Sequence, residues 1–226
     1  MSKVDVGGLE LAYEVAGAPG APPMVLLHGL GGRASGWNTV TPALATRFRV
    51  YAFDARGHGD SDWPGEYSFA LMAADMTAAL DNLGLSEVTL VGHSMGGSVA
   101  WRIAIARPDL VRRLIIEDAP PPVAREPRPL PDQPSEPIDF DWAVVTAIRA
   151  EVDAGDPETW SRLESVKAPT LLIAGGPDSH VPQDTFAEAA RLIPRCELVT
   201  IPVGHRVHHD SPDRFTETVL GWVSAG

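Results

Sequence analysis

One serine in a glycine-flanked run is the residue of this chain best placed to act as a nucleophile. Ser94 lies in GHSMG at 92–96, directly after the apolar stretch 87–91. This stretch predicts a buried strand, and the apolar positions that follow predict a helix over 95–106. A serine in a sharp strand-to-helix turn exposes its hydroxyl beside the free N–H groups of the helix. The pattern therefore indicates nucleophilic attack on a carbonyl group.

Such an attack also needs N–H donors for the oxyanion that develops. A second apolar stretch predicts a strand over 23–28, and it leads into HGLGG at 28–32. Glycines let the backbone approach a ligand closely. We therefore expect the backbone N–H groups of Leu30 and Met95 to form an oxyanion hole.

A histidine near the C-terminus is the candidate general base. His205 follows the strand predicted over 196–201, in a loop from which its ring could reach the serine. His28 and His58 fall in glycine-rich turns and are expected to anchor loops, whereas His180 is expected at the surface. The seven histidines show no metal-ligand spacing, so we predict no metal site.

Three aspartates are candidates for the acid that orients this histidine, of which Asp54 ends another strand and is expected to brace loops instead. Asp178 follows the strand predicted over 169–175 and is the predicted acid. Asp118, at the end of the strand predicted over 112–117, is the alternative. The chain order serine, acid, histidine is that of one hydrolase fold and differs from the chymotrypsin and subtilisin orders.

Four motifs together make the chain resemble the α/β-hydrolase superfamily over nearly its whole length. The resemblance implies a triad of Ser94, Asp178 and His205, and the N-terminal half is most similar to small esterases and enol-lactonases. An elbow serine argues against haloalkane dehalogenases and epoxide hydrolases, which use aspartate there. The motifs are HGLGG at 28–32, FDARGHGDSD at 53–62, GHSMGG at 92–97, and GGPDSHVP at 175–182 with GH at 204–205.

Alternating strand and helix patterns predict an α/β fold, with a mostly parallel central sheet covered by helices on both faces. In the helix predicted over 69–83, Ser68 is the expected N-cap and Gly84 lies just past the end. Strands are predicted near 9–15, 23–28, 48–53, 87–92, 112–117, 169–175 and 196–201, and helices near 36–46, 69–83, 95–106, 182–193 and 211–224.

One segment interrupts this alternation. Eight prolines between 120 and 137 prevent regular helix there, and two amphipathic stretches follow. We therefore expect a hydrolase core of 1–118 and 169–226, and a short proline-rich cap insertion over 119–168. The resemblance places such a cap above the C-terminal ends of the strands. A small cap implies an open pocket, whose expected walls are Leu30, Trp37, Trp63, Met95 and Trp142.

Length and composition limit the size, partners and location expected of this protein. The 226 residues suffice for one sizeable core, and 18 basic against 30 acidic residues give a net charge of −12. An acidic surface repels nucleic acid and anionic membranes, so neither is an expected partner. The N-terminus shows no signal-peptide pattern and no apolar run is long enough to span a membrane, which favours a cytoplasmic location. The single Cys196 is expected to be a small core residue.

The motifs favour a serine hydrolase that cleaves a small carboxylic ester or lactone through an acyl-enzyme on Ser94, as a monomer or homodimer without a cofactor. Carbon–carbon bond hydrolysis and cofactor-free haloperoxidase or perhydrolase chemistry are alternatives on the same fold. Carbon–carbon hydrolysis of a diketone-like acid calls for pocket cations, and the sequence suggests only Arg33 and Arg56. A small-molecule receptor built on the hydrolase fold is the alternative of another class.

Overall fold

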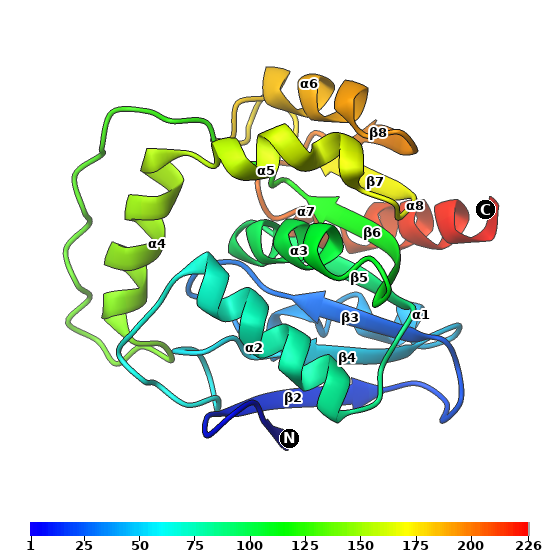
Figure 1. The fold of residues 1–226 in the computed structure, drawn as a ribbon, viewed down its shortest axis with the longest axis horizontal. Helices are drawn as coiled ribbons and strands as arrows, with labels where there is room; N and C mark the ends of the chain where they lie inside the picture. Colours follow the sequence, from blue (N-terminus) through cyan, green and yellow to red (C-terminus); the bar gives the residue numbers. More distant parts are fainter. Residues whose placement is uncertain (226) are drawn as a thin grey trace.

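A single eight-stranded sheet forms the centre of the computed structural model, which describes residues 1–225 (Figure 1). The strands run in the order β1-β2-β4-β3-β5-β6-β7-β8. The strands β3 to β8 are parallel to one another, whereas β1 and β2 are antiparallel to their neighbours. Their bounds are β1 Ser2–Asp5, β2 Glu10–Ala16, β3 Pro23–Leu27, β4 Arg49–Phe53, β5 Val88–His93, β6 Val111–Glu117, β7 Thr170–Ala174 and β8 Cys196–Thr200.

The order of the parallel strands reverses between β3 and β5. From β3 the chain goes outward to β4, and from β5 it goes the other way through β6 and β7 to β8. In open parallel sheets, ligands bind in the crevice at the carboxyl ends of the strands at such a switch point. HGLGG follows β3 and Ser94 follows β5, so both motifs lie at this crevice.

Helices cover both faces of the sheet. Alternate residues of β3 belong to different cores. Val25 and Leu27 join the core beneath the helices over 69–82 and 95–106, and Met24 and Leu26 join the core beneath the helix over 212–225. Burial on both faces explains why the strands are nearly continuous apolar runs. The helices are η1 Ala34–Trp37, α1 Thr41–Leu44, α2 Phe69–Asn82, α3 Met95–Ala106, α6 Asp184–Leu192, α7 Val207–Asp210 and α8 Pro212–Ala225.

The seven predicted strands and the helices over α2, α3, α6 and α8 are confirmed to within two residues. The Ser68 hydroxyl accepts the N–H of Leu71 at 3.0 Å, and Gly84 has a positive φ, as expected for the two ends of α2. The helix predicted over 36–46 is instead two short pieces, η1 and α1. Pro42 lies in the first turn of α1, where its missing N–H costs nothing, and it prevents one continuous helix.

The 119–168 segment has an irregular first half and a helical second half. It contains α4 Trp142–Ala154, α5 Pro157–Arg162 and the 3₁₀ turn η2 Leu163–Ser165. Between 119 and 141 the only pairing is an isolated bridge from Phe140 to His58. In Figure 1, α4 stands beyond the carboxyl ends of the parallel strands, and the irregular chain runs outside it.

Hydrogen bonds connect both ends of the irregular stretch over 119–141 to the rest of the molecule. At its start, the backbone N–H and side chain of Arg125 bond to Asp153 at the end of α4, at 2.9 and 2.6 Å. At its end, the N–H of Asp141 donates to the Gly57 carbonyl at 2.8 Å. Residues 129–137, which lie between these two sets of hydrogen bonds, are all exposed.

Within residues 1–225, no helix has the length and apolar character needed to cross a membrane.

Candidate active site

Ser94 has a strained backbone at the turn between β5 and α3. Its φ of 51° and ψ of −116° lie where residues with a side chain seldom occur. Glycines are required beside it, because a Cβ on Gly92 would lie 2.4 Å from the Gly96 carbonyl oxygen. A Cβ on Gly96 would lie 2.2 Å from the Leu27 carbonyl oxygen. The strand, the turn and the helix therefore have the geometry of a nucleophile elbow.

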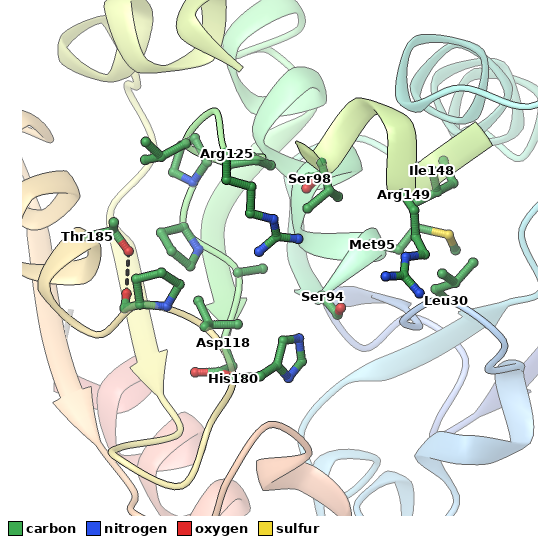
Figure 2. A pocket seen from close by; sticks show the side chains of 18 of the residues that line it. Leu30, Ser94, Met95, Ser98, Asp118, Arg125, Ile148, Arg149, His180 and Thr185 are labelled. Atoms are coloured by element: carbon green, nitrogen blue, oxygen red, sulfur yellow. Dashed lines mark hydrogen bonds between the residues drawn. The ribbon is translucent and has the colours of Figure 1, made fainter. Parts of the chain in front are cut away.

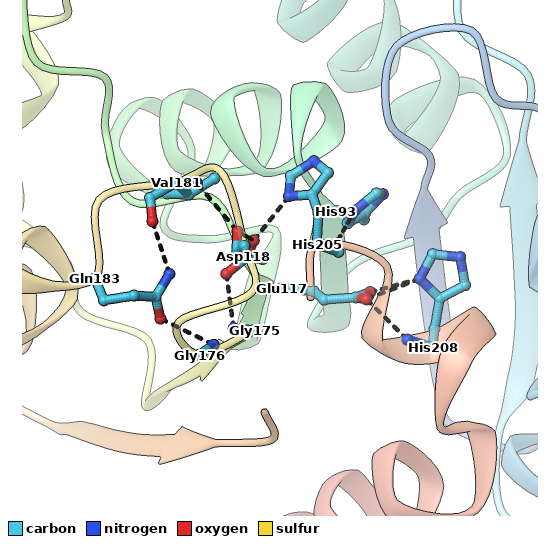
Figure 3. A network of polar contacts seen from close by, with 10 residues as sticks. His93, Glu117, Asp118, Gly175, Gly176, Val181, Gln183, His205 and His208 are labelled. Carbon is cyan, nitrogen blue, oxygen red and sulfur yellow. Dashed lines mark hydrogen bonds and ion pairs between the residues drawn. The ribbon is translucent and has the colours of Figure 1, made fainter. Parts of the chain in front are cut away.

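His205 is oriented by Asp118. Its Nδ1 lies 2.7 Å from Oδ2 of Asp118, so this ring nitrogen carries the proton and Nε2 is left as a base (Figure 3). Asp118 is fully buried and also accepts the Gly175 N–H at 2.7 Å and the Ser179 hydroxyl. Burial opposes ionisation of Asp118, but the bonds from His205, Ser179 and Gly175 outweigh it and hold the pKa of this carboxyl below its usual value.

The prediction that Asp178 orients His205 is contradicted by this contact. Asp178 is exposed on the turn after β7, whereas Asp118 directly follows β6 and is buried. The direction of the two side chains gives the physical reason. The Asp118 carboxylate points inward, where it accepts bonds from Gly175, Ser179 and His205, whereas Asp178 faces solvent.

The N–H groups predicted for the oxyanion hole lie on adjacent turns. Leu30 follows β3 and Met95 follows β5, and these strands pair directly. A bond of 3.1 Å from the Gly96 N–H to the His28 carbonyl joins the two turns. Within residues 1–225, neither predicted donor has a hydrogen-bond partner, so both N–H groups are available to a ligand. Their role in catalysis stays a prediction.

A cavity of about 320 Å³ brings the candidate residues together (Figure 2). Ser94, Asp118 and His205 lie on its lining with Leu30 and Met95. In this arrangement no hydrogen bond joins Ser94 to the His205 ring among the described residues, and such contacts often tighten only when substrate binds. The rest of the lining comes mostly from 119–125, from α4 and from the loop after β7.

The three tryptophans predicted as pocket walls do not line this cavity. Trp37 is fully buried in the core against α8, with its ring 4.1 Å from that of His208. Trp63 is 46 % exposed on a surface loop, and Trp142 begins α4 away from the cavity. His180, expected at the surface, is exposed but also lines the cavity, with its ring 4.2 Å from that of His205.

His28 and His58 anchor loops, as predicted. The His28 ring accepts the N–H of Ala55 at 3.0 Å, and the His58 ring accepts the N–H of Gly31 at 3.2 Å. Burial lowers the pKa of His28 to about 4 and that of His58 to about 3, so both rings are neutral at pH 7. Neutral rings can accept these backbone bonds, which shape the turns beside Ser94.

A buried polar network supports the loop that carries His205. The Glu117 carboxylate accepts both the backbone N–H and the ring of His208, at 2.8 Å each, and the His93 ring donates to the His205 carbonyl at 2.9 Å (Figure 3). Ligand atoms of His93, Glu117 and His208 lie within 4.8 Å of one another, as in a metal site. Their bonds to one another and to the loop already account for their burial.

Three arginines of the cavity were not recognised from the sequence. The two that the sequence suggested are engaged elsewhere: Arg56 forms a buried pair with Asp75, and Arg33 pairs with Asp139 and Asp60. The position of Arg149 among the apolar residues of an amphipathic helix was the only available signal. The arginines that line the cavity are Arg125, Arg128 and Arg149.

The parallel sheet and the nucleophile elbow place this chain in a known class of hydrolases. A family model described as the alpha/beta hydrolase fold matches residues 22–143, and the chain belongs to this family of hydrolases.

Particular relatives extend the likeness to the whole chain. The chain is 28% identical over 268 residues to the mouse (Mus musculus) protein named sn-1-specific diacylglycerol lipase ABHD11, covering 97% of this chain and 87% of the relative. It superposes with a TM-score of 0.83 on Est816, described as an N-acyl homoserine lactone degrading enzyme, at 27% identity over 98% of this chain and 100% of the other. The enol-lactonase from Burkholderia xenovorans LB400 shares the fold, with a TM-score of 0.84 at 23% identity over 99% of this chain and 100% of the other.

Proposed function

We propose that this chain hydrolyses a small carboxylic ester or lactone through an acyl-enzyme on Ser94, with His205 as general base and Asp118 as its acid. The observation that carries the proposal is the shared cavity. A strained elbow serine and a histidine paired with a buried carboxylate line the same space of about 320 Å³. This arrangement suits acyl transfer, because it supplies a nucleophile, a base and an orienting group.

The first step is removal of the serine proton. The bond of 2.7 Å between Nδ1 of His205 and Asp118 fixes the tautomer in which Nε2 can accept that proton. The bonds that keep Asp118 ionised also favour the imidazolium that forms. Ser94 then attacks the carbonyl carbon, and one C–O bond forms as the carbonyl π electrons move to the oxygen.

The oxyanion of the tetrahedral intermediate is held by the N–H groups of Leu30 and Met95. Loss of one such donor costs on the order of 3 kcal/mol of barrier. The intermediate collapses with cleavage of the ester bond, and the His205 imidazolium gives its proton to the leaving alcohol. Water, deprotonated by His205, then cleaves the acyl-enzyme and restores Ser94.

The relatives support ester or lactone cleavage as the reaction. The mouse relative is named as a diacylglycerol lipase and Est816 as an N-acyl homoserine lactone degrading enzyme, so both printed names concern a substrate that contains an ester or a lactone. The elbow serine also separates this chain from fold members that attack with an aspartate.

The test is active-site labelling followed by kinetics. A fluorophosphonate probe should label the wild-type chain and fail to label Ser94→Ala, and short-chain 4-nitrophenyl esters should be turned over only by the wild type. Ser98→Ala, which changes another serine of the same cavity lining, is the matched control and should keep labelling. Saturable binding of an ester without turnover would favour a receptor instead.

Carbon–carbon hydrolysis of a diketone-like acid is the second candidate, because the cavity contains the cations that this reaction calls for. Arg125, Arg128 and Arg149 could hold the carboxylate of such an acid. The measurement is Ser94-dependent cleavage of a vinylogous 1,5-diketone acid, followed by loss of its absorbance. Ester turnover without diketone cleavage would leave the ester hydrolase as the function.

A further inference from the structure

The cavity above Ser94 is cationic although the chain as a whole is acidic. The net charge of the chain is −12, yet Arg125, Arg128 and Arg149 all line this one cavity. Arg125 and Arg128 come from the irregular stretch after β6, and Arg149 comes from α4. Two separate segments of the chain therefore bring positive charge to the same cavity.

These three charges are not balanced by the carboxylates around them. Asp153 is the nearby anion: it pairs with Arg125 at 2.6 Å and lies 3.9 Å from Nε of Arg128. In the part of the lining that the structure describes, the only carboxylate is Asp118, which is committed to His205 and its neighbours. Burial, and then the charges of Arg125 and Arg149, lower the pKa of Arg128, as expected for crowded cations.

Arg149 is the arginine left free to bind a ligand. Among residues 1–225 it forms no ion pair, and its Nε is buried without a hydrogen-bond partner. A buried donor without a partner costs about 1–3 kcal/mol, so such groups call for an explanation. In Figure 2 the guanidinium of Arg149 points from α4 toward the level of Ser94 and Leu30, and that of Arg125 points inward from the other side.

We infer that the substrate carries a carboxylate, which Arg149 binds in the cavity while the ester carbonyl lies at Ser94. A guanidinium presents paired N–H donors that match the two oxygens of a carboxylate. The small volume of the cavity favours a short acyl chain between the carbonyl and the carboxylate. This inference names the substrate class of the proposed esterase and rests on that proposed function.

A matched pair of esters tests the charge. 4-Nitrophenyl hydrogen glutarate and 4-nitrophenyl pentanoate have acyl chains of the same length, and only the first ends in a carboxylate. The wild type should prefer the glutarate by at least about tenfold in kcat/KM. Equal kcat/KM values, or a preference for the pentanoate, would overturn the inference.

Variants of Arg149 assign the preference to this residue. Arg149→Met keeps an apolar stem in α4 and should lower the glutarate-to-pentanoate ratio of kcat/KM by about 10- to 100-fold. Arg149→Lys keeps the charge without the planar fork and should retain part of the ratio. Arg214→Met, on the exposed face of α8, is the matched control and should leave the ratio unchanged. A ratio that Arg149→Met does not lower would overturn the assignment.

Binding to Ser94→Ala separates this inference from the proposed reaction. Calorimetry with glutarate should show binding that weakens at least about tenfold when Arg149→Met is added. This result would support the carboxylate site even if neither ester were turned over, in which case only the proposed reaction fails. Tighter binding of inorganic phosphate than of glutarate would overturn the carboxylate class. Turnover of the pentanoate with no glutarate binding would keep the esterase and reject the inference.

Discussion

Replacement of Asp118 by asparagine should abolish most of the activity while the fold is kept. The side chain accepts three hydrogen bonds, from Gly175, Ser179 and His205. An asparagine can keep the bond from Gly175 through its carbonyl oxygen, but its amide then faces Nδ1 of His205 as a donor. The histidine would have to carry its proton on Nε2, where it can no longer accept the proton of Ser94.

The expected loss in kcat is about 10⁴-fold, the magnitude typical of a wrong histidine tautomer in a serine triad. This corresponds to about 5 kcal/mol of barrier. Asp178→Asn, which changes an exposed carboxylate on the turn after β7, is the matched control and should change kcat by less than about twofold.

The assay is steady-state hydrolysis of an activated 4-nitrophenyl ester by both variants, with circular dichroism to verify that each remains folded. Two results would refute the reasoning. One is a loss below about tenfold in folded Asp118→Asn, and the other is a loss in Asp178→Asn as large as that in Asp118→Asn.

Three further predictions concern stability. Ser94→Gly should be about 1 kcal/mol more stable than Ser94→Ala in urea unfolding, because glycine relieves the positive φ that alanine would keep; equal stabilities would argue against strain. Gly96→Ala should lose about 2–3 kcal/mol, since its Cβ would meet the Leu27 carbonyl at 2.2 Å; a change below about 0.5 kcal/mol would contradict this contact. Burial lowers the pKa of His28 from 6.5 to about 4 in the folded chain. Between about pH 6.5 and pH 4 the unfolded chain therefore binds a proton that the folded chain does not, and the free energy of unfolding falls as the pH falls through this window. His28→Gln should reduce that slope by about 1.4 kcal/mol per pH unit in urea titrations, and an unchanged slope would show that His28 does not contribute to it.

The main elements of the fold could be predicted because their residues are buried in regular patterns. The strand at Ser2–Asp5 was missed because it is four residues long, has one buried side chain, and lies at the edge of the sheet. Trp37 was expected in the pocket wall, but it lies in the 3₁₀ turn η1 and its side chain is buried in the core.

The candidate acid shows where sequence reasoning reaches its limit. Asp118 and Asp178 both follow buried strands, and local pattern does not distinguish them. They differ in how the turns after β6 and β7 fold, because the Asp118 carboxylate turns inward to Gly175, Ser179 and His205 and Asp178 faces solvent. Arg149 was missed for a similar reason, because an amphipathic pattern does not tell which way α4 lies across the site.

The hydrogen bonds at the two ends of the irregular stretch after β6 have a consequence for how the sequence of this protein can diverge. Because the bonds of Arg125 and Asp141 fix the chain on either side, the position of the cavity lining does not depend on the exposed residues 129–137. Doubling the length of such a loop costs only about 0.6 kcal/mol of closure entropy. Insertions and deletions can therefore accumulate between Arg125 and Asp141 during evolution, while the positions of Ser94, Asp118 and the arginines of the cavity lining stay the same.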